Sequence, residues 1–332
     1  MNVLLPPEDV RGLIGQGQKL LLAGDEELLS DLPAGCWIGG TTPYFMIEQH
    51  PQHSREKIHV TVLPDFVQSV DIRQYDETSI HRVYADAPAN GISFIIIPAK
   101  ASTHYTFALH APNFESFAVR PLIGWISGVD LKKPGFQLPK AYNGMNKVAS
   151  ENAAVVMHIT LPNDKVADIG IINLFSQGSG DQIVFPDDGF KTRSAYINGR
   201  LQNYRDYLLD KNIDTWLPLV ADYHGISINT SIREVNERQE AVEFYAPVFS
   251  NLSYKHARPV TNYNNRFEQL MPTGLEQHLL FACNCILNHR DHEPYLEAPP
   301  GIPGPITFGE IAYLLLNQTM VYVRIIDLPS PA

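Results

Sequence analysis

Residues that could hold a small ligand gather at three places in the sequence. The first is the run 36–45, where Gly39 and Gly40 follow a strand-like segment and precede Thr41 and Thr42. Because glycine has no Cβ, a ligand can approach the backbone closely at such a turn. The threonine hydroxyls and the neighbouring amides could then bind a carboxylate, phosphate or amide group. The same pattern also suits a tight strand exit, with a threonine capping the next element.

The second place is the segment 304–319, where Glu310 directly follows Gly309. A carboxylate at such a turn can accept hydrogen bonds from a ligand amine or guanidinium group. Two aromatic residues and an amide lie close to it in the sequence: Phe308, Tyr313 and Asn317. The alternative interpretation is a helix that begins near Thr307, with Glu310 completing a capping box.

The third place is the segment 281–292, which contains Cys283 and Cys285. On a strand, these two side chains point to the same face. Together with His289 and His292 they could form a thiolate and imidazole metal site, although their spacing matches no common zinc pattern. Two buried core thiols are the alternative, because free cysteine is among the most buried residue types. Two amides of the same segment are candidate ligand groups: Asn284 and Asn288.

The common catalytic motifs of hydrolases, zinc proteases and dinucleotide enzymes do not occur in the sequence. Cys36 beside a glycine turn could act as a nucleophile if its pKa were lowered, and Cys283 and Cys285 are the other possible reactive thiols. No base lies next to Cys36 in the sequence. We therefore expect ligand binding without catalysis, and the alternatives are an enzyme that uses a cysteine nucleophile or Glu310 as base, and a haem- or metal-binding sensor. No cofactor is expected for the main interpretation.

Composition narrows the possible partners. The 332 residues carry a formal net charge of −11, which argues against nucleic acids and anionic membrane surfaces as partners. No apolar run is long enough to span a bilayer, and the first residues lack the pattern of a signal peptide. The chain has three cysteines, an odd and small number for its length, so we expect no framework of disulfide bonds. The expected location is the cytoplasm.

Hydrophobic periodicity predicts a mixed α/β protein. The first part alternates helices with buried strands such as 19–24, 58–63 and 92–97, and helices are expected at 7–15, 25–32, 76–84 and 104–110. Strands joined by turns follow, including a hairpin of 153–161 with 166–174. We expect two related halves, 1–190 and 191–332, with mixed sheets flanked by helices and a ligand cleft between the halves.

The second and third places resemble the C-terminal part of the FIST family, bacterial sensory domains for small ligands. The matching residues are 281–285, the run Thr307-Phe308-Gly309-Glu310-Ile311 and the triplet Asn317-Gln318-Thr319. The glycine turn of that family's N-terminal part resembles 36–42, and the segment 218–259 also looks FIST-related.

This resemblance implies a sensory protein in bacterial signal transduction. The ligand would be an amino acid or a similar small polar metabolite, and haem is also associated with parts of the family. In this picture Glu310 holds a cationic group, Thr41, Thr42 and the Gly39 and Gly40 amides hold an anionic one, and aromatic residues line the walls: Tyr44, Phe308 and Tyr313. A separate signalling protein would receive the output.

Overall fold

The computed structural model describes residues 2–48, 50–132, 137–223, 225–289 and 301–329. It shows a mixed α/β protein in which helices flank several mixed sheets, as the sequence predicts. The chain forms two compact units, each discontinuous in sequence. The first unit contains Met1–Ile171, Met271–Leu315 and Met320–Ala332, and the second contains Ile172–Leu270 and Leu316–Thr319. The expected boundary near residue 190 therefore falls inside the second unit.

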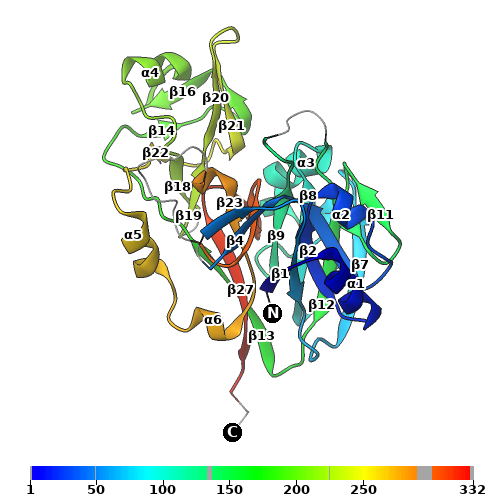
Figure 1. The fold of residues 1–332 in the computed structure, drawn as a ribbon. Coiled ribbons are helices and arrows are strands. Elements are labelled where there is room, and N and C mark those ends of the chain that lie inside the picture. Colours follow the sequence, from blue (N-terminus) through cyan, green and yellow to red (C-terminus); the bar gives the residue numbers. More distant parts are fainter. Residues whose placement is uncertain (1, 49, 133–136, 224, 290–300, 330–332) are drawn as a thin grey trace. The chain divides into compact units, whose positions relative to one another are not determined.

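The first sheet of unit 1 carries two helices on one face. Its strand order is β1 (Asn2–Leu5), β6 (Ile58–Val62), β2 (Leu20–Gly24), β3 (Trp37–Thr41), β10 (Ala141–Asn143) and β11 (Val148–Ser150). Only β2 and β3 in this sheet are parallel. Helices α1 (Pro7–Gly15) and α2 (Glu26–Ser30) pack on the sheet through Val10, Ile14 and Leu29 (Figure 1). The all-apolar β2 is therefore buried on both faces, which is typical of strands in parallel pairs.

The second sheet packs against the first. Its order is β26 (Leu314–Leu316), β25 (Glu310–Ala312), β9 (Leu122–Ser127), β8 (Gly91–Pro98), β12 (Ala154–Thr160) and β7 (Ser69–Tyr75). Every residue of β8 and β9 is buried, and these two strands are parallel. Helix α3 (Ser102–His110) follows β8 and packs on it, and its buried residues include Phe107 and Ala108. The expected helix at 76–84 is reduced to a single 3-10 turn, Ile80–Arg82, because Asp76 ties the preceding residues into a side-chain-bonded turn.

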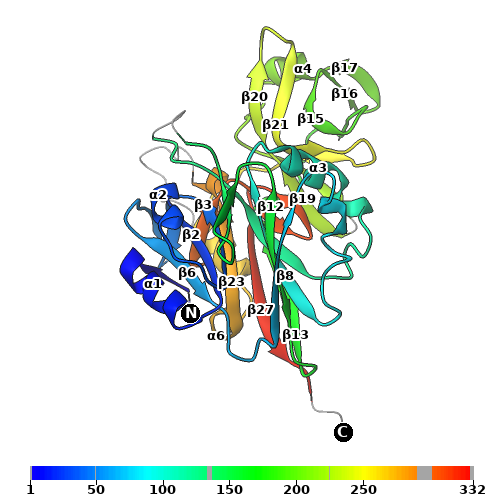
Figure 2. The same cartoon turned by 90° about the vertical axis from the view of Figure 1, so that its right-hand side faces the viewer.

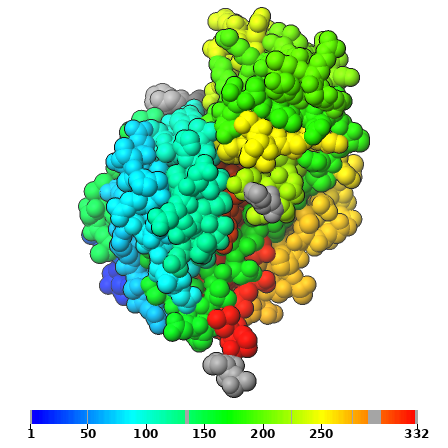
Figure 3. Space-filling model, turned by 180° about the vertical axis from the view of Figure 1, so that it is seen from behind, coloured from blue at the N-terminus to red at the C-terminus, as the bar shows by residue number. Residues whose placement is uncertain are grey.

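The third sheet joins distant parts of the chain. Its order is β13 (Lys165–Ile172), β27 (Met320–Asp327), β23 (Leu279–Cys285), β24 (Gly304–Thr307), β4 (Tyr44–Ile47) and β5 (His50–His53). Figures 2 and 3 show β27 beside β13, and the side chains of Asp327 and Lys165 form an ion pair. The short helix α6 (Leu275–His278) leads into β23.

Unit 2 contains two small sheets. One has the order β17 (Arg200–Asn203), β16 (Ser194–Ile197), β14 (Ile183–Val184), β22 (Tyr254–His256), β18 (Leu219–Tyr223) and β19 (Ile226–Thr230). The other has the order β15 (Gly189–Thr192), β21 (Ala241–Val248) and β20 (Ile232–Asn236). Helix α4 (Tyr204–Asp210) is capped by Asn203, and α5 (Tyr263–Leu270) ends the unit's main segment. Across the described ranges of the chain, no helix is both long and apolar enough to cross a membrane.

Candidate functional site

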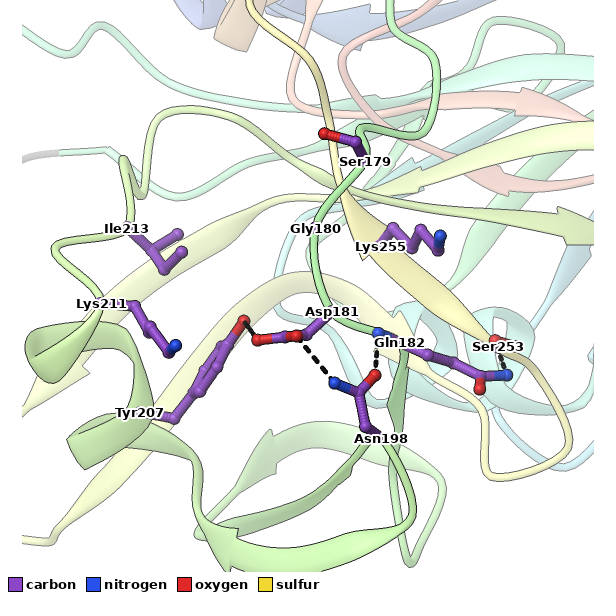
Figure 4. A pocket seen from close by; sticks show the side chains of 10 residues that line it. All are labelled: Ser179, Gly180, Asp181, Gln182, Asn198, Tyr207, Lys211, Ile213, Ser253 and Lys255. Atoms are coloured by element: carbon purple, nitrogen blue, oxygen red, sulfur yellow. Dashed lines mark hydrogen bonds between the residues drawn. The ribbon is translucent and has the colours of Figure 1, made fainter.

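A polar pocket of about 740 Å³ lies within unit 2 (Figure 4). This volume is in the range of small-molecule sites. Four parts of the unit line it: the segment 179–182 before β14, the turn between β16 and β17, the end of α4 with the residues after it, and β22 with the residue before it. They contribute Ser179, Gly180, Asp181, Gln182, Asn198, Tyr207, Lys211, Ile213, Ser253 and Lys255.

Asp181 is held in place by two hydrogen bonds. The Tyr207 hydroxyl donates to Oδ2 of Asp181 at 3.1 Å, and Nδ2 of Asn198 donates to Oδ1 at 2.7 Å. Burial raises the pKa of Tyr207 to about 12, and both the charge of Asp181 and the hydrogen bond act in the same direction. Tyr207 therefore stays protonated at neutral pH and acts as a donor. A carboxylate has about four acceptor positions, so Asp181 can still bind a ligand.

The Asn198 side chain is fixed by its turn. Asn198 and Gly199 have φ angles of 49° and 82°, the left-handed conformations that a two-residue hairpin turn requires. The side-chain oxygen Oδ1 of Asn198 accepts a hydrogen bond of 2.9 Å from the backbone nitrogen of Gln182. Gln182 Nε2 in turn donates to the Ser253 hydroxyl at 2.8 Å. The polar wall of the pocket is thus a connected network that exists without a ligand.

Two lysines make the pocket electropositive. In the view of Figure 4 the side chains of Lys211 and Lys255 lie to either side of the segment that carries Asp181. Within the described part of the chain, neither ammonium group lies within ion-pair distance of a carboxylate. Two positive charges against one negative charge favour a ligand with an anionic group, and Asp181 offers a place for a cationic group of the same ligand.

A second polar cluster lies in unit 1 at the β4–β5 hairpin. His53 Nε2 lies 3.3 Å from Oδ2 of Asp130, whose side chain is only 2% exposed. The Tyr44 hydroxyl and the Lys132 amide both donate to Oδ1 of Asp130, at 3.2 and 2.9 Å. Burial alone raises the pKa of Asp130, but these hydrogen bonds and the charge of His53 outweigh it, so the pKa is lowered overall. Asp130 is therefore a buried carboxylate that remains charged.

The carboxyl ends of the parallel strands β2 and β3 meet next to this cluster, a frequent ligand position in α/β sheets. Asp25, directly after β2, accepts a 2.7 Å hydrogen bond from Nε of Arg55 and caps α2 through the Glu27 amide. The cavity between Asp25 and Asp130 has a volume of only about 10 Å³. That is room for roughly one water molecule, so this cavity, as the described residues form it, is too small for a metabolite.

The segment that was expected to form a glycine turn belongs to strand β3. Gly39 and Gly40 lie inside β3, and a Cβ on Gly40 would stand 2.6 Å from Ile96 and 2.8 Å from the Trp125 indole nitrogen. Gly40 therefore allows two sheets, and not a ligand, to approach closely, whereas a Cβ on Gly39 would meet Trp37 and Leu22 of its own sheet at 3.3–3.5 Å. Thr41 accepts a 2.9 Å hydrogen bond from the Lys140 amide.

Thr42 is fully buried and is bonded within the fold. Its hydroxyl donates to the Ile306 carbonyl at 2.7 Å, which ties the end of β3 to β24. Both Thr41 and Thr42 line the small cavity beside Asp25, which among the described residues is too small for a metabolite.

The predicted turn at Gly309 is present, but no helix begins near Thr307. The Thr307 hydroxyl donates to the Gly309 carbonyl at 3.1 Å, and Gly309, with a φ of 150°, links β24 to β25. The Phe308 ring lies over Gly128, where a Cβ would stand 1.9 Å from the ring. The capping-box interpretation is therefore wrong, because pairing with β9 fixes this segment as strands.

Glu310 lies in the core of unit 1 and is fully buried. Burial raises the pKa of the neighbouring Cys283 thiol well above its usual value, and the charge of Glu310 adds to this effect. Tyr313 is also engaged, since its carbonyl accepts a hydrogen bond from the Tyr84 hydroxyl. Neither Glu310 nor Tyr313 lines the pocket of unit 2.

The predicted amide ligands have structural partners. Asn284 is fully buried, donates to the Ile302 carbonyl at 2.7 Å and accepts from the Ile302 amide at 3.1 Å. Asn288 is 3% exposed. The Asn317 side chain lies 3.0 Å from the Ser231 hydroxyl inside unit 2.

The raised pKa values of Cys36 and Cys283 argue against activation of these two thiols. Burial raises the pKa of Cys36, an effect that Lys19 only partly offsets, and Cys285 is fully buried. His289 is half-buried, whereas His292 lies outside the described residues. In the described ranges, no three His, Cys, Asp or Glu side chains are arranged to hold a metal ion.

None of the ligand residues expected from the sequence lines the unit 2 pocket. The sequence does contain signals for parts of it. Asn198-Gly199 is a strong hairpin-turn dipeptide, and residues 178–181 form a turn-like run. Lys211 and Lys255 carry no local signal, because their proximity depends on the pairing of distant strands.

A comparison with models of protein families finds a match to this chain. A family model described as "Family of unknown function (DUF6976)" matches residues 5–326. This range includes both the polar cluster around Asp130 and the polar pocket of unit 2. No curated protein matches the chain. Because the match covers nearly the whole sequence, the chain belongs to the DUF6976 family.

Proposed function

We propose that this protein binds an amino acid or a similar small polar metabolite in the pocket of unit 2. The observation that carries the proposal is the pair Lys211 and Lys255, which have no carboxylate partner in the described residues and share a 740 Å³ pocket with Asp181. A ligand that enters the pocket removes water from the two ammonium groups. A ligand that also carries an opposite charge compensates for this desolvation and is therefore selected over an uncharged one.

The charge arrangement suits a zwitterion. One of the two ammonium groups would bind the ligand carboxylate, the other would add to the positive charge of the pocket, and the free acceptor positions of Asp181 would bind the ligand amine. The Ser179 and Ser253 hydroxyls and the Asn198 amide could bind a polar side chain of the ligand. Since the network around Asp181 is already formed, little ordering cost would accompany binding.

A sensory role in bacterial signalling remains part of the proposal through the resemblance to FIST domains. Ligand binding would then be read by a separate signalling protein in the cytoplasm. The pocket itself supports the binding step, whereas the raised pKa values of Cys36 and Cys283 give no support to a thiol nucleophile.

The experiment is a thermal-shift and calorimetric screen of the twenty amino acids and of matching carboxylic acids without the amine. A ligand that binds should raise the melting temperature of the wild type. The double variant Lys211→Gln/Lys255→Gln should bind it about tenfold more weakly or worse, because each charge-assisted hydrogen bond contributes roughly 1.5–3 kcal/mol. Lys147→Gln, an exposed lysine of unit 1, is the matched control.

Asp181→Asn separates a zwitterion from a plain anion. This variant should weaken binding of the amino acid but not of the same acid without its amine. The proposal fails if no compound in the screen binds, or if the double lysine variant binds as tightly as the wild type.

A further inference from the structure

A second and larger cavity lies entirely in unit 1, with a volume of about 950 Å³. Its walls come from β1, the β4–β5 hairpin, the residues around α6 and the start of β23. The strand β1 is the outermost strand of its sheet. This cavity shares no residue with the polar pocket of unit 2.

The walls of this cavity are mainly apolar. Leu4, Ile47, Met271 and Leu279 are half-buried at its sides, and Ile302 is 1% exposed at its surface. A polar molecule would leave its hydrogen-bonding groups without partners against these side chains. An apolar body, in contrast, would remove the side chains from water.

The cavity is built into the fold. The side-chain amide of Asn284 both donates to and accepts from the Ile302 backbone, which fixes this wall. Next to it, Gly301 leaves no room for a side chain, because a Cβ would stand 2.5 Å from Oδ1 of Asn284 and 2.8 Å from Cε of Met46. The wall is therefore set by core contacts, and a ligand would find it preformed.

The rim carries one positive and one negative charge. Lys57 and Glu48 are both exposed there, and in the described part of the chain neither lies within ion-pair distance of an oppositely charged side chain. Lys57 can bind a single anionic group that stays in water while the apolar body is buried. Glu48 would repel a second anionic group, so one acid group suits this rim better than two.

We propose that this cavity binds a single-chain amphiphile with one terminal carboxylate, such as a medium-chain fatty acid. The hydrocarbon chain lies between Leu4, Ile47, Met271 and Leu279, and the carboxylate lies at Lys57. This site is separate from the proposed metabolite pocket, so either can fail without the other.

The test uses the full-length protein, a fluorescent anilinonaphthalene sulfonate probe and decanoate as competitor. Decanoate should displace the probe from the wild type with a saturable curve. Leu4→Trp should abolish this competition by filling the cavity, since Leu4 lines it and alternates along β1 with Val3 and Leu5, which pack against the helix-covered core. Leu209→Trp, at an exposed leucine of α4, should bind like the wild type.

The carboxylate is tested with Lys57→Gln, which should weaken decanoate up to about fivefold but leave decanol unchanged. Decanedioate should bind more weakly than decanoate to the wild type. The proposal is overturned if decanoate does not compete, if it competes equally in Leu4→Trp, or if Lys57→Gln affects decanol and decanoate alike. Should Leu4→Trp not fold, as judged by its melting curve, Ile47→Trp fills the same cavity from the opposite sheet.

Discussion

The hydroxyl of Ser93 lies 2.6 Å from Nδ1 of His158 in the buried centre of the second sheet. On its other side, Nε2 of His158 lies 2.9 Å from the Tyr75 hydroxyl, which donates to Asp86 at 3.1 Å. Because the Tyr75 proton goes to Asp86, Nε2 carries the imidazole proton and Nδ1 accepts from Ser93. A neutral His158 satisfies every member of this chain of hydrogen bonds.

Stability should therefore fall in mild acid. Burial, together with the charge of Arg73, lowers the pKa of His158 from 6.5 to about 4. Burial also lowers the pKa of three further histidines to about 4: His59, His104 and His256. A histidine whose folded pKa is lowered contributes stability that is complete above pH 6.5 and is lost as the pH falls towards 4.

The measurement is the free energy of unfolding in urea at pH 7, 6, 5 and 4.5. Each unit of lowered pKa corresponds to about 1.4 kcal/mol, so the decline should be steep and should begin below pH 6.5. His158→Gln should be less stable than the wild type at pH 7 but should lose less on acidification. A free energy that is constant from pH 7 to 4.5 would contradict the prediction.

Gly40→Ala should destabilise the protein by about 1–3 kcal/mol, because the new methyl group meets Ile96 and Trp125 between two packed sheets. Gly12→Ala is the matched control. Gly12 lies inside α1 with no atom within 4 Å of the Cβ position, so this change should stabilise the helix by roughly 0.5–1 kcal/mol. Thermal unfolding of both variants should show melting temperatures on opposite sides of the wild type.

Asp130→Asn should destabilise unit 1 by about 1–3 kcal/mol at pH 7. The change removes the charge that faces His53, and it replaces one carboxylate oxygen by an NH₂ group that cannot accept a hydrogen bond. Because the pKa of Asp130 is lowered in the fold, the difference from the wild type should shrink as the pH falls through that pKa. The measurement is the free energy of unfolding in urea between pH 7 and 4.5. Asp187→Asn, which changes an exposed carboxylate, should leave this free energy almost unchanged.

Asn173 and Asn229 should be energetically coupled. Each side-chain amide donates to the carbonyl oxygen of the other, at 2.9 and 3.0 Å, and Asn229 also donates to the Gln318 carbonyl at 3.0 Å. A double-mutant cycle with alanine should show a coupling of about 0.5–3 kcal/mol. Asn229→Ala should also speed hydrogen exchange in residues 316–319, whereas Asn152→Ala on the surface should do neither.

Much of the local structure follows from the sequence. Continuous apolar runs predict the buried strands β2 and β8, and the structure confirms both. The helix predicted at 7–15 is confirmed as α1. The helix expected at 76–84 does not form beyond the turn Ile80–Arg82, because hydrogen bonds to the Asp76 side chain compete with helix formation. The segment after Thr307 has a helix-start pattern, yet strand pairing with β9 overrides it.

The candidate sites depend on long-range pairing, which a single sequence does not reveal. In the sequence, Gly40 looks like a glycine that contacts a ligand. Its missing Cβ in fact leaves room for Trp125, which is far away in the chain. Asn284 looks like a ligand amide, but its partner Ile302 closes a cavity wall. Lys211 and Lys255 look like ordinary surface lysines until β22 and α4 bring them to one pocket.

The position of β27 between β13 and β23 constrains how this chain can be made. The third sheet cannot be completed on the ribosome until residues 320–327 have emerged from the exit tunnel. Until then β13 and β23 expose strand edges that invite pairing with other nascent chains. We therefore expect translation stopped before residue 320 to yield aggregates or chaperone-bound chains, while unit 2, whose main segment is synthesised earlier, can already begin to collapse.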